Sequence, residues 1–149
     1  MKFLADTMLG KLAKWLRVLG YDTHYQNYYT DSMMRRLLTE GPILLSRRKE
    51  IIHRYQNTYY IRSDHLGKQL RELQEGLHLR PDRSRWFSRC LTCNVLLREA
   101  PMEEVREKVP EYVLYENMPI FRFCPSCERY FWPGSHRVKM KRELEKWGF

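Results

Sequence analysis

The sequence contains no long hydrophobic run. Its longest uninterrupted apolar stretch is the four residues 112–115, far short of the roughly 20 residues that a membrane-spanning helix needs. The opening residues also reach Asp6 before a hydrophobic signal segment could form, so no secretory signal is predicted. We therefore expect a cytoplasmic protein that does not cross a bilayer.

Acidic side chains are in short supply. Eighteen Asp and Glu residues stand against 27 Lys and Arg, which gives a net charge of +9. The excess is not a basic tail, because residues 1–75 carry +5 and residues 76–149 carry +4. This balance favours polyanionic partners, with nucleic acid as the leading class. The alternative is a basic surface with no such partner, since net charge alone describes solubility and non-specific association.

Cysteine is also scarce, and the four cysteines form two C-x-x-C pairs, Cys90 with Cys93 and Cys124 with Cys127. One tight turn can present both thiolates of a pair to the same ion, and two such turns complete a tetrahedral site with no position left for a substrate. The spacing therefore predicts a structural zinc site. The alternatives are two local disulfides, which a reducing cytoplasm disfavours, or a redox C-x-x-C, which needs only one pair.

Short apolar segments around the cysteines predict a small ribbon of strands. We expect strands at residues 95–97, 112–115, 120–123 and 130–132, helical turns within 103–108, and a charged helix at 139–146. A ribbon this small buries little surface, so metal binding should supply much of its folding free energy.

The first half of the chain alternates short strands with amphipathic helices. Strands are predicted at 2–5, 23–25, 43–45 and 59–61, and helices at 8–19, 31–39, 49–55 and after a cap at Ser63. Alternating units of this kind predict an α/β fold with a parallel sheet. We expect residues 1–85 to form this domain and residues 86–149 to form the zinc ribbon with its short C-terminal helix.

Three carboxylates follow or face the carboxyl ends of the predicted strands, where α/β proteins collect their ligands. Asp6 follows the first strand, Asp31 opens the second helix, and Asp64 follows the fourth strand. Together they would suit Mg²⁺ or Mn²⁺ and a metal-assisted phosphodiesterase. The alternative for Asp31 and Asp64 is local, because acids at helix starts cap free N–H groups; Asp31 also follows Thr30, a good cap residue.

Basic and aromatic residues provide candidate RNA contacts, since guanidinium groups bind phosphates and rings stack on unpaired bases. We expect Lys11, Lys14 and Arg17 to lie on an exposed helix face. The other candidates follow the third strand or precede the first cysteine pair: Arg47, Arg48, Arg80, Arg83, Arg85, Trp86 and Arg89. The alternative is that Trp86 and its neighbour Phe87 pack internally while the arginines stay in water.

Several segments carry a family resemblance: residues 3–22, 63–64 with 69–70, 89–94, 124–127 and 132–136. Together they resemble the Mut-seven C-terminal ribonuclease-like domain family. The resemblance implies a PIN-like nuclease fold followed by a zinc ribbon, an RNA substrate, and acidic site positions at Asp6, Asp31 and Asp64. His136 falls in the last segment and is expected to orient its neighbours rather than to bind zinc.

One position departs from the family. After the third strand the family usually reads Thr-Arg-Asp, whereas this chain reads Ser46-Arg47-Arg48. An arginine there would repel a divalent cation and can itself hold a phosphate oxygen. Glu50 points from a helical turn and does not obviously replace the lost acid.

The sequence thus favours an RNA-directed protein, most simply a metal-dependent PIN-like endoribonuclease with a structural zinc ribbon. The alternative is a catalytically weakened RNA-binding factor, bound for example to structured or ribosomal RNA, in which Arg47 and Arg48 hold the RNA backbone without cutting it. A third class, a protein-interaction module that docks through its ribbon, has no specific sequence feature in its favour.

Overall fold

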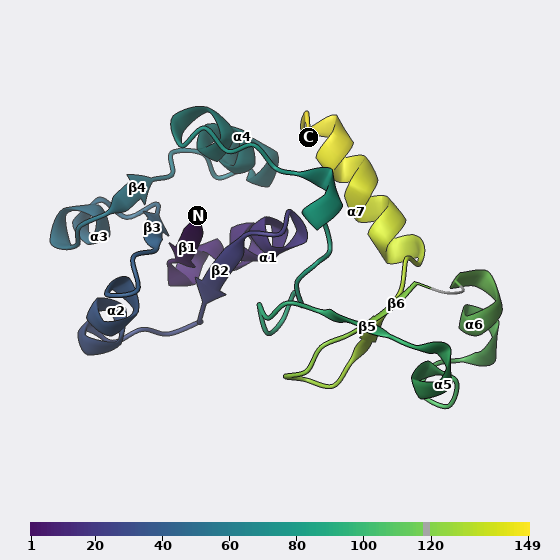
Figure 1. Ribbon diagram of the computed structural model, residues 1–149. Helices are drawn as coiled ribbons and strands as arrows, with labels where there is room; N and C mark the ends of the chain where they lie inside the picture. Colours follow the sequence, from purple (N-terminus) through teal and green to yellow (C-terminus); the bar gives the residue numbers. More distant parts are fainter. Residues whose placement is uncertain (118–119) are drawn as a thin grey trace. The chain divides into compact units, whose positions relative to one another are not determined.

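The computed structural model describes residues 1–117 and 120–149. The chain divides into two compact units, Met1–Asn94 and Val95–Phe149 (Figure 1). Within the described residues, every helix is too short or too polar to traverse a membrane.

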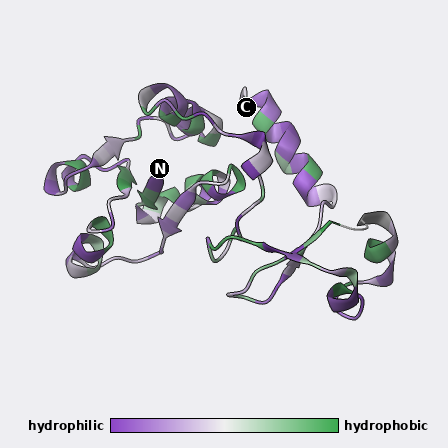
Figure 2. Cartoon of the chain, in the orientation of Figure 1, coloured by the Kyte–Doolittle hydropathy of each residue, from purple (hydrophilic) through white to green (hydrophobic). Residues whose placement is uncertain are grey.

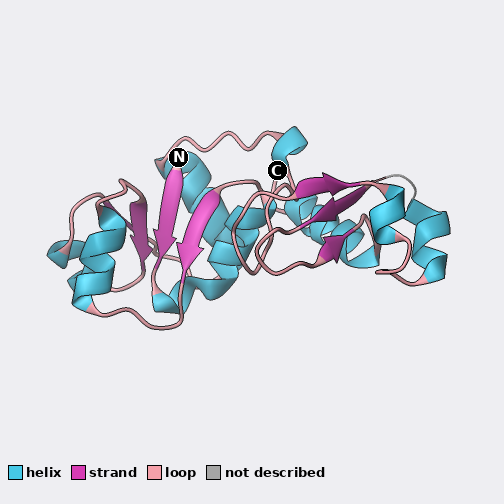
Figure 3. Cartoon of the chain, turned by 60° about the horizontal axis from the view of Figure 1, so that its bottom comes forward, coloured by secondary structure: helices cyan, strands magenta, loops and turns pink. Residues whose placement is uncertain are grey.

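The first unit contains a four-stranded parallel sheet (Figure 3). Its strands are β1 (Lys2–Ala5), β2 (Asp22–Tyr25), β3 (Ile43–Ser46) and β4 (Thr58–Tyr60), in the order β2-β1-β3-β4. Each neighbouring pair is parallel. The predicted α/β architecture is therefore confirmed, and β1 and β3 are its central strands.

Helices follow the strands at the spacing that the apolar residues predict. They are η1 (Thr7–Leu9), α1 (Gly10–Val18), α2 (Asp31–Leu38), α3 (Lys49–Arg54), α4 (Leu66–Gly76) and η2 (Arg83–Arg85). In α1, Leu12 and Leu16 are fully buried, as are Leu70 and Leu73 in α4. Residues three or four apart share one helix face, so α1 and α4 each present a leucine ridge to the core.

Helix α4 begins at Leu66, two residues later than a cap at Ser63 would place it. The Ser63 hydroxyl accepts a hydrogen bond from the His65 N–H at 3.1 Å, which folds the preceding loop instead of capping the helix. The Glu72 carboxylate of α4 accepts the N–H groups of Arg62 and Ser63 at 2.9 and 2.7 Å. Loop and helix are thereby tied together.

Gly20 closes α1 in the left-handed region, with φ of +91°. A Cβ at this position would lie 2.6 Å from the carbonyl oxygen of Arg85. Glycine is required here by the backbone angle and by the close approach of a second segment.

The second unit contains a small antiparallel sheet in the order β5-β6-β7. The strands are β5 (Arg98–Ala100), β6 (Phe121–Phe123) and β7 (Tyr130–Phe131), and the helices are α5 (Met102–Val105), α6 (Glu111–Asn117) and α7 (Ser135–Lys146). Its core consists of Ala100, Val105, Val113 and Phe121. Helix α7 is mostly hydrophilic along its length (Figure 2).

One of the predicted ribbon strands is wrong and another is displaced. Residues 95–97 directly precede β5 and contain a single bridge residue at Leu96, whereas residues 112–115 lie in α6. Helix α6 follows Pro110, whose carbonyl accepts the Val113 N–H at 3.0 Å. Val113 is buried while Tyr112 and Tyr115 are exposed. Burial of one face at this spacing suits a helix, and it outweighs the strand preference of tyrosine and valine.

Candidate functional site

The two C-x-x-C pairs fold into matching turns, which we call the first knuckle (residues 90–94) and the second knuckle (residues 124–128). In the first, the Cys93 N–H approaches the Cys90 sulfur at 3.4 Å and the Asn94 N–H bonds the Cys90 carbonyl at 2.8 Å. The second repeats this pattern at Cys124, with distances of 3.5 and 2.8 Å. Both turns end on a residue with φ near +60°.

The sulfur atoms of Cys90, Cys93, Cys124 and Cys127 all lie within 4.8 Å of one another. Cys90 and Cys124 are fully buried. Four convergent thiolates are the donor set of a closed structural zinc site, so the cluster is consistent with the predicted zinc.

Arg17 supports the first knuckle. Its guanidinium donates to the Thr23 carbonyl at 2.9 Å, to Leu91 at 2.7 Å and to Thr92 at 3.2 Å. Asn94 reinforces this contact by accepting the Thr23 N–H at 3.0 Å. Arg17 is only 6% exposed, so the expectation that it faces solvent is wrong. Three carbonyls gathered at one point require a donor, and the guanidinium satisfies them.

Asp6 lies at the carboxyl end of β1 and is fully buried. Its Oδ1 accepts the Met8 N–H at 3.3 Å and the Thr7 hydroxyl at 3.0 Å, which caps η1. Its Oδ2 accepts a hydrogen bond from the Ser46 hydroxyl at the end of β3. The two central strands therefore meet at this carboxylate.

Arg48 binds the same carboxylate with two hydrogen bonds. Its Nε donates to Oδ2 and its Nη2 to Oδ1, both at 3.0 Å. Burial raises the pKa of Asp6, but the hydrogen bonds from Arg48, Ser46, the Met8 N–H and Thr7 outweigh burial and hold this pKa below its usual value. A cation ligated by Asp6 would have to displace the guanidinium. We call Asp6, Ser46 and Arg48 the Asp6 rim.

Asp31 and Asp64 are both exposed. Asp31 accepts a hydrogen bond from the Tyr55 hydroxyl at 2.6 Å and from Arg35 Nε at 2.9 Å, and these bonds lower its pKa. The cap of α2 is Thr30, which accepts the Met33 N–H. Asp64 lies 3.6 Å from His65 Nε2 and does not cap α4.

The three aspartates do not converge. A shared metal ion needs at least three His, Cys, Asp or Glu side chains close together. Among the residues that the structure describes, the four cysteines alone form such a group. The predicted set Asp6, Asp31 and Asp64 is not such a group.

The basic candidates fall into two classes. Lys11, Lys14, Arg80, Arg83 and Arg85 are exposed. Arg89, by contrast, donates to the carbonyls of Gly20 at 3.2 Å and Asn94 at 2.7 Å. Arg47 is half-buried, and its Nε has no hydrogen-bond partner among the described residues. Arg85 Nη2 also donates to the Gly20 carbonyl, at 3.4 Å. Arginines that bind backbone carbonyls stabilise the fold, which leaves the exposed Lys11, Lys14, Arg80 and Arg83 as candidate phosphate contacts.

Trp86 differs from the base-stacking expectation. Its ring is 5% exposed, and Arg83 lies over it at 5.3 Å from the ring centroid. The sequence had left internal packing open as the alternative to base stacking for Trp86, and an exposure of 5% agrees with internal packing.

Sequence reasoning missed the hydroxyls of Thr7 and Ser46 as partners of Asp6. The signal for Ser46 was its place at the carboxyl end of a central strand. It also missed Tyr112 and the cavity of the second unit that is described below, because residues 112–115 were expected to form a strand.

Residues 1–144 match the family model described as the Mut7-C RNAse domain. The chain belongs to this family. The motif resemblance is thereby confirmed, and membership of an RNase family implies an RNA substrate for this Mut7-C domain. Neither curated proteins nor solved structures give a match to the chain.

Proposed function

We propose that this Mut7-C domain is an RNA-binding protein in which Arg48 closes the Asp6 rim to a divalent ion. The observation that carries this proposal is the pair of 3.0 Å hydrogen bonds from Arg48 to both oxygens of Asp6. A guanidinium in this position supplies the positive charge that Mg²⁺ or Mn²⁺ would otherwise bring to the carboxylate. The Asp6 rim as it stands therefore does not fit a catalytic ion.

The distribution of charge supports RNA binding by the first unit. Residues 1–94 contain 17 Lys and Arg against 9 Asp and Glu, whereas residues 95–149 contain 10 against 9. Nearly the whole positive excess therefore belongs to the unit with the parallel sheet. Phosphate groups supply the electrostatic part of RNA affinity, so this unit is the principal RNA-binding surface.

The second candidate function is a metal-dependent endoribonuclease, and the observation that favours it is the family's description as an RNase domain. In this case Arg48 would leave Asp6 when substrate binds, and Asp6, with Asp31 or Asp64, would hold Mg²⁺ or Mn²⁺. The two candidates differ in whether the wild-type chain cleaves RNA.

A cleavage assay separates them. A labelled mixed RNA pool is incubated with the full chain in Mg²⁺, in Mn²⁺ or in EDTA, and binding is followed on the same samples. We expect salt-sensitive binding without metal-dependent cleavage. Arg48→Asp should gain metal-dependent cleavage, because it releases Asp6 and adds a second carboxylate beside it.

Two matched variants test the cause of that gain. Arg48→Gln releases Asp6 without adding an acid and should stay inactive. Adding Asp6→Asn to Arg48→Asp should abolish the gained cleavage. Wild-type cleavage that disappears both in EDTA and in Asp6→Asn would reject the closed rim and establish the endoribonuclease.

The exposed lysines of α1 give a second test. Replacing Lys11 and Lys14 together by Ala should weaken RNA binding and reduce the slope of log affinity against log salt by about 1.4, since each contact with single-stranded RNA contributes roughly 0.7. The control is Lys146→Ala, whose ammonium group pairs with Glu143 at 2.9 Å in α7. An unchanged slope in the double variant would remove α1 from the RNA-binding surface.

A further inference from the structure

A cavity of about 650 Å³ lies within the second unit. Its wall comes from α6, from β7, from the turn at residues 132–134 and from the first residues of α7. The aromatic members of the lining are Tyr112, Tyr130, Phe131 and Trp132, and none of the lining residues whose side chains the structure describes is acidic. The volume falls within the usual range for small-molecule sites, which is roughly 300–1,000 Å³.

The rings of this cavity are held in different ways. Tyr130 and Trp132 pack against the core of the unit, and the Tyr130 hydroxyl donates to Glu104 at 2.9 Å. A Cβ on Gly134 would lie 3.2 Å from Trp132 Nε1, so the absence of a side chain lets this turn follow the indole closely. Tyr112, in contrast, is 65% exposed. The cavity thus combines a fixed aromatic wall with one accessible ring.

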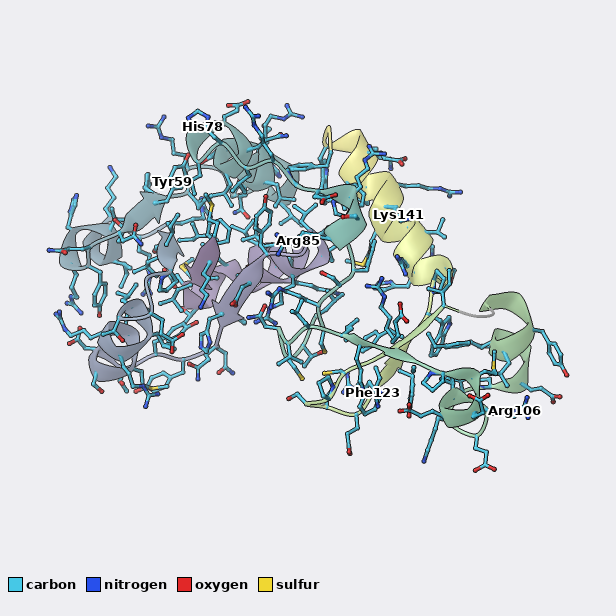
Figure 4. All side chains as sticks on the ribbon, viewed as in Figure 1. Tyr59, His78, Arg85, Arg106, Phe123 and Lys141 are labelled. Atoms are coloured by element: carbon cyan, nitrogen blue, oxygen red, sulfur yellow. The ribbon has the colours of Figure 1, made fainter. Side chains whose placement is uncertain are left out.

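Positive charge is concentrated on the same part of the chain. Residues 129–142 carry five Lys and Arg side chains and no Asp or Glu, whereas the rest of the second unit carries five basic and nine acidic residues. Four of the five are exposed and one is half-buried; Lys141 is labelled on α7 in Figure 4. The five are Arg129, Arg137, Lys139, Lys141 and Arg142.

We propose that this cavity binds an unpaired base of single-stranded RNA, with the basic residues of 129–142 holding the neighbouring phosphates. Aromatic rings stack on any base, and a flanking positive strip follows the backbone. An apolar peptide would use the rings but not the charge, which favours RNA. Duplex RNA is excluded because its bases are already stacked within the helix. This inference rests on the RNA binding proposed above and adds a second contact, specific for single strands.

The test measures the affinity of the full chain for a fluorescein-labelled single-stranded U10 by anisotropy. Tyr112→Ala should weaken binding by about tenfold, a typical loss for one stacked base. The matched control is Tyr115→Ala, because Tyr115 lies on the same helix, is 76% exposed and does not line the cavity. Both tyrosines are exposed, so each variant should fold; zinc content and circular dichroism verify this.

A U10 analogue with the same phosphates but abasic positions isolates the stacking contribution. It should bind more weakly than U10, and equally to wild type and to Tyr112→Ala. Equal U10 affinity for wild type and Tyr112→Ala would overturn the base site while leaving RNA binding by the first unit intact. If wild type bound no RNA at all, the proposed function itself would fail. Loss of a protein partner in Tyr112→Ala, with U10 affinity unchanged, would assign the cavity to protein and also overturn the inference.

Discussion

Replacing Cys124 by Ser should abolish zinc binding and unfold residues 95–149. The core cluster that the structure describes in this unit is small and consists of Ala100, Val105, Val113 and Phe121. A core of this size stabilises a fold weakly, whereas a structural zinc site contributes roughly 10–16 kcal/mol in zinc-finger peptides. Treatment with a strong chelator should produce the same loss. Metal content and amide hydrogen exchange of residues 95–149 measure both effects.

Ser126→Ala is the matched control, because this exposed residue lies between Cys124 and Cys127 and does not ligate. It should retain one zinc per chain and native exchange protection. A Cys124→Ser protein that kept its zinc and its protection would contradict the four-thiolate site. The absorption spectrum of the Co²⁺-substituted protein provides an independent readout, since thiolate ligands give it intense charge-transfer bands in the near ultraviolet.

Replacing Arg48 by Met should destabilise the first unit by about 2–3 kcal/mol at pH 7. The change leaves Asp6 buried and charged without its cationic partner, and breaking such a pair costs roughly 3–5 kcal/mol when both members are buried. The Arg48 side chain keeps 38% of its exposure, so water already screens the pair and a smaller loss is expected. Denaturant unfolding measures the difference.

The stability difference between the wild type and Arg48→Met should depend on pH. In the wild type the folded pKa of Asp6 is lowered, so its contribution to stability is present above the unfolded value of about 3.8 and is lost as pH falls through the lower folded value. In Arg48→Met, loss of the two guanidinium hydrogen bonds raises the pKa of Asp6 relative to its wild-type value, so acid neutralises the carboxyl at a higher pH than in the wild type. The difference in the free energy of unfolding between the two proteins should therefore decrease as pH falls from 7 toward 4.

Arg47→Met serves as the control, because Arg47 makes no hydrogen bond to Asp6. Its stability should differ little from wild type across the same pH range. Adding Asp6→Asn to Arg48→Met should recover much of the lost stability, since no buried charge remains. If the difference in unfolding free energy between the wild type and Arg48→Met stayed constant with pH, Asp6 would be excluded as the source of the destabilisation.

The sequence predicted most of the fold because local signals and tertiary burial agree in the first unit. All four strands of its sheet were predicted, since short strand segments alternate regularly with helical segments; β1 and β3 in addition are apolar runs. The agreement fails at residues 112–115, where strand-forming residues occupy a helix. Their burial pattern depends on contacts with Ala100, Val105 and Phe121, which are distant in sequence, and no local pattern contains that information.

The candidate site was less predictable than the fold. The cysteines were found because their spacing alone determines which sulfur atoms can share an ion. The pairing of Arg48 with Asp6 was not found, although both residues had been singled out. Arg48 was expected to repel a cation or hold a phosphate, whereas the nearest anion is the protein's own carboxylate. Similarly, Arg17 was placed by helical periodicity on the exposed face, but carbonyl groups from residues 23, 91 and 92 surround it.

The Asp6 rim is built on the two inner strands of the sheet, and this position determines how readily its residues can move. Inner strands bond to neighbours on both sides and open only with the whole unit, whereas edge strands and their helices open locally at lower cost. Amides of β1 and β3 should therefore exchange with solvent more slowly than those of β2 and β4. Any opening of the Asp6–Arg48 pair in the native state must then come from a rotation of the arginine side chain, which takes nanoseconds when solvent is accessible. The carboxylate stays in place, and only its partner is free to leave.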